Sequence, residues 1–345
     1  MMSTEERKTI YLCLAHMSEE GFEQKYVKEA FDTNWVVPMG PNVNAFEQNL
    51  ADFANANLDG SKLDRKVVCL SAGTAAVHLA LIACGVKAGD EVCVQSFTFC
   101  ASSHPITYLG AKPVFIDSER ETWNMDPELL EKAIVERKAV TGKYPKAIIP
   151  VALYGMPYDC ERIMAIADKY GIPVIEDAAE GMGSRFNGQV LGTFGRFGVL
   201  SFNGNKMITT SGGGALICRN EEDANNIMWH ATQARDAYPY YQHTEIGYNY
   251  RMSNVCAGIG RGQMTVLDKH IAHHKHVQAL YKELLEEVKG IHLHEQPETM
   301  NPKTGERKFD SNFWLCAATL DEDVKIQGQE SAYKEVIKTA VGGAA

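Results

Sequence analysis

Short apolar runs alternate with amphipathic stretches between about residues 66 and 220, and this alternation constrains the fold more than any other feature of the chain. The apolar runs are KVVCL, DEVCVQS, KPVFID, KAIIPVAL and PVIEDAA, and helical stretches such as AAVHLALIACG and CERIMAIADKYG lie between them. Apolar strands bounded by Gly, Pro and Asp, each followed by a helix, are typical of a parallel sheet covered on both faces. The pattern predicts an α/β layered domain.

The pattern changes beyond about residue 240. Residues 243–288 have mostly the pattern of one long helical stretch, after which HLHEQ and SNFWLCAATL have the pattern of strands. We therefore expect a large domain over residues 1–240 and a smaller α+β domain over residues 241–345.

The charge of the chain excludes some classes of partner. The formal net charge is −10, and no basic run is present that could neutralise a nucleic-acid backbone. With 45% hydrophobic residues the chain can bury a large core. We expect a small-molecule substrate.

The nine cysteines are scattered, odd in number and without a CxxC pair. This usage indicates reduced, buried thiols in a cytoplasmic protein, with neither a disulfide frame nor a zinc site. The N-terminal MMSTEERKTIYLCLAHMSEEG lacks the features of a signal peptide, and no later segment has the roughly 18 apolar residues of a membrane span. We expect a cytoplasmic location.

Four predicted strands end in unusual sequences. SAGTAAVH, FTF, DAAEGMGS and GNK each follow an apolar run. Because ligands bind at the carboxyl ends of strands in such sheets, these four sequences should converge on one cleft.

The first of these strand ends, SAGTAAVHLAL, leads directly into a helix. Ser71, Gly73 and Thr74 could form a phosphate cradle from free backbone N–H groups, a hydroxyl and the helix dipole. An ordinary helix N-cap explains these residues equally well. The sequence matches neither a Walker P-loop nor a dinucleotide fingerprint.

Two further strand ends carry a carboxylate and aromatic rings. Asp177 ends an apolar strand, where an ionised carboxylate is costly without a cationic partner. It is either a helix N-cap or the partner of a protonated ring nitrogen. Phe97 and Phe99 alternate with Thr98, so they are either core residues or a platform for a flat ligand.

Lys206 lies in SFNGNKMITTSGGGAL, a few residues after an apolar run. A lysine in a loop is most often a solvated surface residue. A phosphate cradle, an aspartate, an aromatic plate and a lysine at neighbouring strand ends instead suit pyridoxal 5′-phosphate (PLP), to whose aldehyde a lysine can bond.

The same stretches resemble a known family. SAGTAAVHLAL, PVFIDSERETWNMDPELLEKAI, the segment from IEDAAEGMGS to TTSGGGAL, and GYNYRMSN look like the DegT/DnrJ/EryC1/StrS sugar aminotransferases. NWVVPMGPNVNAFEQ, SFNGNK, TQAR and GYNYRMSNV resemble the branch that aminates the 4-keto group of UDP-4-keto-6-deoxy-N-acetylglucosamine. The resemblance extends in order over essentially the whole chain.

The resemblance implies the PLP-dependent transferase fold type I, with a mostly parallel central sheet and a smaller α+β C-terminal domain. It also implies amino transfer from glutamate to a nucleotide-linked keto sugar, for cell-surface polysaccharide or glycan precursors, in a homodimer with shared active sites. The residue roles that it implies are a Schiff base at Lys206, a contact of Asp177 with the pyridinium nitrogen, stacking by Phe99, phosphate binding by Thr74, Ala75 and Ser201, and a phosphate contact from Asn249 of the partner subunit.

The chain departs from the family pattern in two places. Glu180 stands near the expected position of the cofactor's phenolic oxygen, where glutamine or histidine is frequent. The chain also stops at KEVIKTAVGGAA without the RPLWKPMH-like segment of relatives, so we expect an incomplete small domain.

Two other functions fit the same resemblance. A non-catalytic regulator could bind PLP or a sugar nucleotide without turnover, and a sugar dehydratase could share the fold. Lys206 favours the aminotransferase, because a binding protein needs no such lysine and the dehydratases replace it with histidine.

Overall fold

The computed structural model describes residues 16–322 and residue 324. Cys13, with the rest of residues 1–15, and the C-terminal KEVIKTAVGGAA lie outside these residues. The helices are α1 (Phe22–Asp32), α2 (Pro41–Asn55), α3 (Gly73–Ala83), α4 (His104–Tyr108), α5 (Pro127–Thr141), α6 (Cys160–Tyr170), α7 (Glu221–Ala231), α8 (Asn254–Met264) and α9 (Leu267–Leu285), with 3-10 turns η1 (Cys100–Ser102) and η2 (Leu153–Gly155). The strands are β1 (Lys66–Leu70), β2 (Glu91–Gln95), β3 (Lys112–Ile116), β4 (Ala147–Ile149), β5 (Ile175–Asp177), β6 (Arg185–Phe186), β7 (Gln189–Val190), β8 (Phe197–Ser201), β9 (Gly214–Cys218), β10 (Ile291–Leu293), β11 (Phe309–Asp310) and β12 (Ala318–Leu320).

The central sheet has the strand order β3-β2-β4-β5-β8-β9-β1. Parallel pairing joins β3, β2 and β4, and it also joins β5 to β8. Parallel bridges from Ile148 to Val174 and from Val151 to Asp177 connect the two halves between β4 and β5. Among the strands of this sheet that the structure describes, β9 alone runs opposite to the others, antiparallel to β8 and β1. The prediction of a mostly parallel sheet is therefore confirmed.

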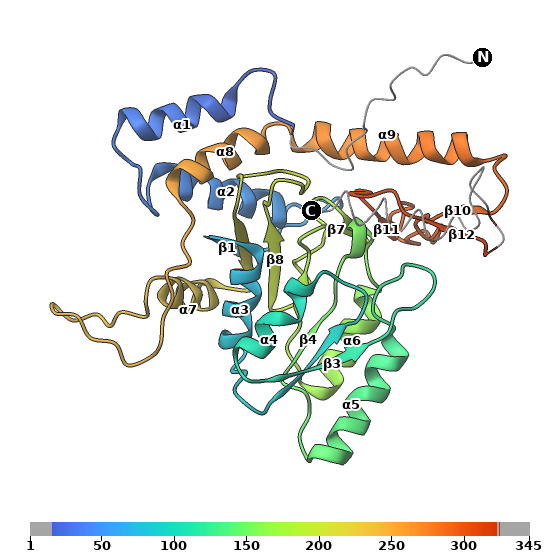
Figure 1. Ribbon diagram of the computed structural model, residues 1–345, viewed down its shortest axis with the longest axis horizontal. Helices are drawn as coiled ribbons and strands as arrows, with labels where there is room; N and C mark the ends of the chain where they lie inside the picture. Colours follow the sequence, from blue (N-terminus) through green and yellow to red (C-terminus); the bar gives the residue numbers. More distant parts are fainter. Residues whose placement is uncertain (1–15, 323, 325–345) are drawn as a thin grey trace.

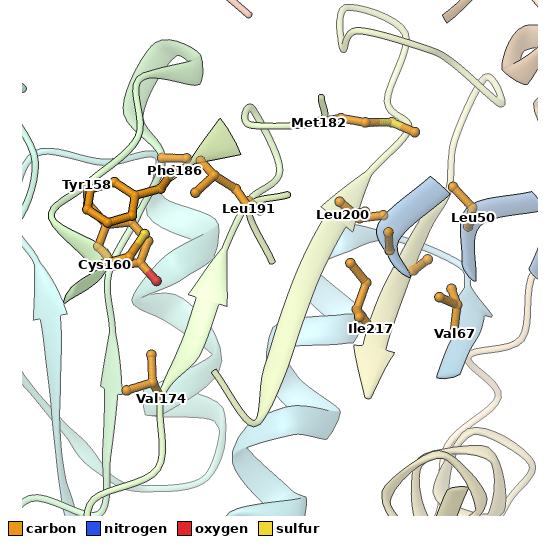
Figure 2. Packing of buried hydrophobic residues seen from close by; sticks show 14 of the residues in the cluster. Leu50, Val67, Tyr158, Cys160, Val174, Met182, Phe186, Leu191, Leu200 and Ile217 are labelled. Carbon is orange, nitrogen blue, oxygen red and sulfur yellow. The ribbon is translucent and has the colours of Figure 1, made fainter. Parts of the chain in front are cut away.

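Helices cover both faces of this sheet (Figure 1). Along β1 the side chains alternate: Val68 and Leu70 join a core cluster with α3, α4 and α7, whereas Val67 and Cys69 join a cluster with α2, α5 and α6. Period-two alternation sends successive strand residues to opposite faces, and both faces here are apolar. Figure 2 shows part of the second cluster, in which side chains from α2, β1, β8 and β9 gather: Leu50, Val67, Leu200 and Ile217.

The C-terminal part differs from two expectations. The single helical stretch expected over residues 243–288 is wrong, because α8 and α9 are separate helices. A non-helical arm, residues 232–253, precedes α8 and projects from the body in Figure 1. The strand expected over SNFWLCAATL is limited to β12, which pairs with β10. Residues 311–314 form a buried loop instead, because Phe313 has a φ of 48° and side chains bind the backbone there.

Helix α8 packs within its own chain. Its glycines allow close approach on two sides: Gly258 and Gly262 lie against Tyr26 and Glu23 of α1, and Gly260 lies against Phe46 of α2. Asn254 reinforces this packing, since its Oδ1 accepts from the backbone N–H of Asn42 at 2.9 Å. Helices α1 and α2 of the same chain therefore cover the glycines of α8.

The eight cysteines within the described ranges are all free thiols. Five are buried, Cys256 and Cys316 are partly buried, and Cys100 is exposed, so the expectation of buried thiols is wrong for Cys100. In the same part of the chain, no helix has the length and apolar character needed to cross a membrane.

Candidate functional site

Lys206 lies in the connection between β8 and β9, at the carboxyl end of β8. Its Nζ is 3.2 Å from Oε1 of Glu180, and the two side chains are only 13% and 10% exposed. A solvated turn would leave the ammonium in water, so that interpretation of Lys206 is wrong. A buried cation here needs the paired carboxylate, because an uncompensated buried charge is strongly unfavourable.

Glu180 links the lysine to a strained turn. Its Oε2 accepts a 2.7 Å hydrogen bond from the backbone N–H of Tyr154, which has a φ of 55° within η2. Burial raises the pKa of Glu180 above its ordinary value, and the Lys206 ammonium opposes this rise. Lys206 and the Tyr154 N–H therefore stabilise the ionised form of Glu180.

Asp177 ends β5 and pairs with Val199 of β8. It is 6% exposed, and its Oδ2 accepts a 2.5 Å hydrogen bond from Oγ of Ser102. Its Oδ1 accepts from the backbone N–H of Ala179 at 3.2 Å, but no helix begins there in the described chain, so the helix N-cap interpretation is wrong. The carboxylate is held in a fixed orientation at the end of the strand.

Phe99 stands directly before η1, which carries Ser102. Its carbonyl oxygen accepts from the backbone N–H of Ser102 at 3.1 Å, and its side chain is 68% exposed. Phe97 is also partly exposed and meets the ring of Tyr154 edge-on, with centroids 6.0 Å apart. Neither phenylalanine is a core residue, which leaves the face of Phe99 open to a flat ligand.

The N-terminus of α3 is uncapped. Ala72 precedes the helix in extended conformation, and no side chain accepts from the first-turn N–H groups. Ser201 of β8 lies against Gly73, where an added Cβ would come within 3.1 Å of the serine Cβ. The ordinary N-cap interpretation is thus wrong, and the free N–H groups beside Thr74 and Ala75 can receive an anion.

These contacts join the predicted residues into one region. Ser102, three residues after Phe99, binds Asp177, and Lys206 contacts Glu180, three residues after Asp177. Ser201 ends β8, the strand beside β5, and lies against Gly73. The arrangement fits PLP on three counts: an uncapped helix for a phosphate, an oriented carboxylate for a ring nitrogen and an exposed ring for stacking.

Asn249 is the exception. It lies in the arm before α8, its side chain is exposed, and its backbone forms a bridge with Thr232. The flanking Tyr248 and Tyr250 pack on His78 of α3, at ring distances of 4.9 and 6.0 Å. The arm is thereby attached to the helix that begins at the anion cradle, but no contact brings Asn249 to the other predicted residues within the described chain.

Sequence reasoning missed three residues of the site. Ser102 orients Asp177, Tyr154 binds Glu180, and the ring centroid of Trp314 lies 4.1 Å from the Lys206 Nζ. Ser102 lies three residues after Phe99, so its signal was available. Trp314 carried none, because SNFW has the composition of a strand and lies far from the other motifs in sequence.

Comparisons with known proteins agree with this geometry. The family model described as the DegT/DnrJ/EryC1/StrS aminotransferase family matches residues 17–341. EpsN of Bacillus subtilis (strain 168) is 46% identical over 91% of this chain and 76% of its own length. The GDP-perosamine synthase of Escherichia coli O157:H7 is 36% identical over 82% of this chain and 73% of its own. The PLP form of Spr1654 from Streptococcus pneumoniae has a TM-score of 0.80 at 25% identity, over 98% of this chain and 84% of that chain. The chain therefore belongs to the DegT/DnrJ/EryC1/StrS family of PLP-dependent aminotransferases.

Proposed function

We propose that this protein transfers an amino group from glutamate to the keto carbon of a nucleotide-linked sugar. The observation that carries the proposal is the buried pair of Lys206 and Glu180, which lies beside Asp177 at the carboxyl edge of the sheet. A lysine that is kept out of water and held by a carboxylate suits a reactive amine better than a structural one.

The residues that would hold PLP come from five segments. The phosphate would lie at the N-terminus of α3, Asp177 would face the ring nitrogen, and Lys206 would hold the cofactor through its amine. Glu180 would lie at the edge of the ring beside Lys206. The proposed contacts are Thr74, Ala75, Phe99, Asp177, Glu180, Ser201 and Lys206, with Asn249 supplied by the partner subunit.

The chemistry divides between the cofactor and the chain. PLP, when bound, supplies an aldehyde that bonds to amines and a ring that accepts an electron pair. Asp177, held by Ser102, would keep the ring nitrogen protonated. Lys206 Nζ would take the proton from the Cα of the amino donor and deliver it to the former aldehyde carbon of the cofactor, and Glu180, 3.2 Å away, can hold the ammonium between these transfers.

The proposal extends to the nucleotide that the sugar carries. The sequence stretches shared with the UDP-sugar branch make a UDP-linked 4-keto-6-deoxy sugar the first candidate. The name of the Escherichia coli relative makes a GDP-linked sugar the second. Assays of the loaded enzyme with both nucleotides, and glutamate as donor, decide between them through the rate of amino-sugar formation.

We also propose a homodimer and a division of the chain near residue 240. The exposed arm that carries Asn249 would reach the phosphate site of the partner subunit. The C-terminal part of the chain would in this way complete the site of a neighbour as well as its own.

Absorbance spectroscopy tests the function directly. Adding PLP to the purified protein should produce a visible band that glutamate abolishes, and borohydride reduction should label Lys206. Lys206→Ala should lack the band, whereas the control Lys169→Ala, which removes a surface lysine paired with Glu131, should keep it. A band that persists in glutamate would favour the regulator, and labelling of another lysine would refute the assignment.

A further inference from the structure

A segment from the C-terminal part of the chain closes the site behind Lys206. Strand β11 pairs with β6, and the chain then continues through Ser311 and Asn312 to Trp314. Ser311 and Asn312 are fully buried, and Trp314 is only 6% exposed. This segment, residues 311–314, is therefore part of the interior around the lysine.

Asn312 fixes the segment to the strand end that carries Glu180. Its Nδ2 donates to the carbonyl oxygens of Glu180 and Met182, both at 2.9 Å. Its Oδ1 accepts from the backbone N–H of Trp314 at 2.8 Å. The backbone N–H of Asn312 donates to Oγ of Ser184 at 2.9 Å. These four buried hydrogen bonds of Asn312 hold the segment in one position.

Trp314 makes two contacts on the lysine side. Its ring centroid is 4.1 Å from Nζ of Lys206, and its Nε1 donates a 2.7 Å hydrogen bond to the carbonyl oxygen of Asn205, the residue before the lysine. Glu180 meets the same Nζ at 3.2 Å. The ammonium thus lies between a carboxylate and an aromatic face, both of which favour a cation.

We propose that Trp314 is a positioning residue for Lys206. The indole face confines Nζ to the side of Glu180, and the Nε1 bond holds the backbone from which the lysine projects. A lysine side chain has four rotatable carbon–carbon bonds, so confinement removes unproductive orientations of the amine before reaction. The proposal rests on the proposed function only in taking Lys206 as the reactive amine.

Acylation of the cofactor-free protein with acetic anhydride tests the contact without using the reaction. Mass spectrometry compares the rate at Lys206 with the rate at Lys169 in the same sample. Trp314→Leu removes the ring and uncovers Nζ, so the relative rate at Lys206 should rise about tenfold. Trp314→Phe keeps a smaller aromatic face but loses the Nε1 hydrogen bond, so the relative rate at Lys206 should rise by about two- to threefold.

Trp229→Phe is the matched control. Trp229 also donates its indole N–H to a backbone carbonyl, that of Arg235 at 2.9 Å, but it lies on α7, away from Lys206. This control should leave the relative acylation rate unchanged. If Trp314→Leu does not fold, the comparison of the two phenylalanine variants still decides: equal rates at Lys206 in Trp314→Phe, Trp229→Phe and the parent would overturn the proposal.

Steady-state kinetics separate positioning from a structural role. With PLP bound, Trp314→Phe should lower kcat while leaving KM for the sugar within about twofold, because the ring acts on the amine and not on sugar binding. An unchanged kcat would overturn the proposal. If Lys206 proves not to bind PLP, the function fails, but the acylation result still reports on the contact between Trp314 and Lys206.

Discussion

Gly155→Ala should be strongly destabilising, because two separate costs meet at this residue. Gly155 has a φ of +88°, a conformation that costs an L-residue about 1–2 kcal/mol. A Cβ there would also overlap with Oδ1 of Asn312, so Asn312 must move. Three side-chain hydrogen bonds of Asn312 are then lost, each contributing about 1 kcal/mol. The expected loss is about 4–5 kcal/mol in the free energy of unfolding.

Gly142→Ala is the matched control for this prediction. Gly142 has a φ of +76° at the end of α5, but an added Cβ there would meet nothing within 4 Å. Only the backbone cost of about 1–2 kcal/mol remains. The difference between the two variants, about 3 kcal/mol, therefore measures the collision with Asn312.

Equilibrium unfolding in urea, followed by tryptophan fluorescence, gives both values. Addition of Asn312→Ala to Gly155→Ala should recover part of the loss relative to the sum of the single variants, because the alanine leaves room for the new Cβ. Equal destabilisation in Gly155→Ala and Gly142→Ala would refute the reasoning, since it would mean that the segment around Asn312 adapts at no cost.

Four further predictions concern the site, the core and the arm. Asp177→Asn should lower kcat by several orders of magnitude, with little change in PLP affinity measured by titration, because the ring nitrogen loses its anionic partner; a near-normal kcat would contradict the assignment. Burial lowers the pKa of His78 below 6.5, so folding loses stability as the pH falls below that value; His78→Phe should lose less stability between pH 7 and pH 5 in urea unfolding than the parent does. Phe46→Ala, at a fully buried position, should cost about 3–5 kcal/mol in the same assay. Mixing inactive Lys206→Ala with an impaired Asn249→Asp should restore activity through one intact site per heterodimer; exchanged subunits without recovery would count against a shared site.

The fold of the large part of the chain follows closely from sequence pattern. Strands such as β1 and β2 are continuous apolar runs, and their neighbours in the sheet are buried on both faces, so local sequence and long-range packing favour the same structure. Strand β9 is the exception, because nothing in GALIC distinguishes an antiparallel from a parallel strand. Its direction accords with the connection after β8, residues 202–213, which contains no crossover helix.

The candidate-site residues that end or closely follow a strand were predictable from the sequence. Asp177 and Lys206 both follow apolar runs, and the two strands that lead to them, β5 and β8, are neighbours in the sheet. Trp314 was not predictable, because its position depends on hydrogen bonds of Asn312 to a segment more than a hundred residues earlier. The exposed position of Asn249 is equally invisible in the sequence, since GYNYR has no periodicity that would predict an arm.

Because residues 311–314 lie beside Lys206, the active centre can be completed only after the ribosome has synthesised this segment. Asn205 and Trp314, which share a hydrogen bond, are separated by 109 positions in the chain. At about 5–20 residues per second, a ribosome needs on the order of 5 to 20 seconds to pass from one to the other. During that interval the nascent sheet can form while Lys206 and Glu180 lack their indole cover. The active centre is thus finished late in translation, after most of the domain that carries its lysine has already emerged.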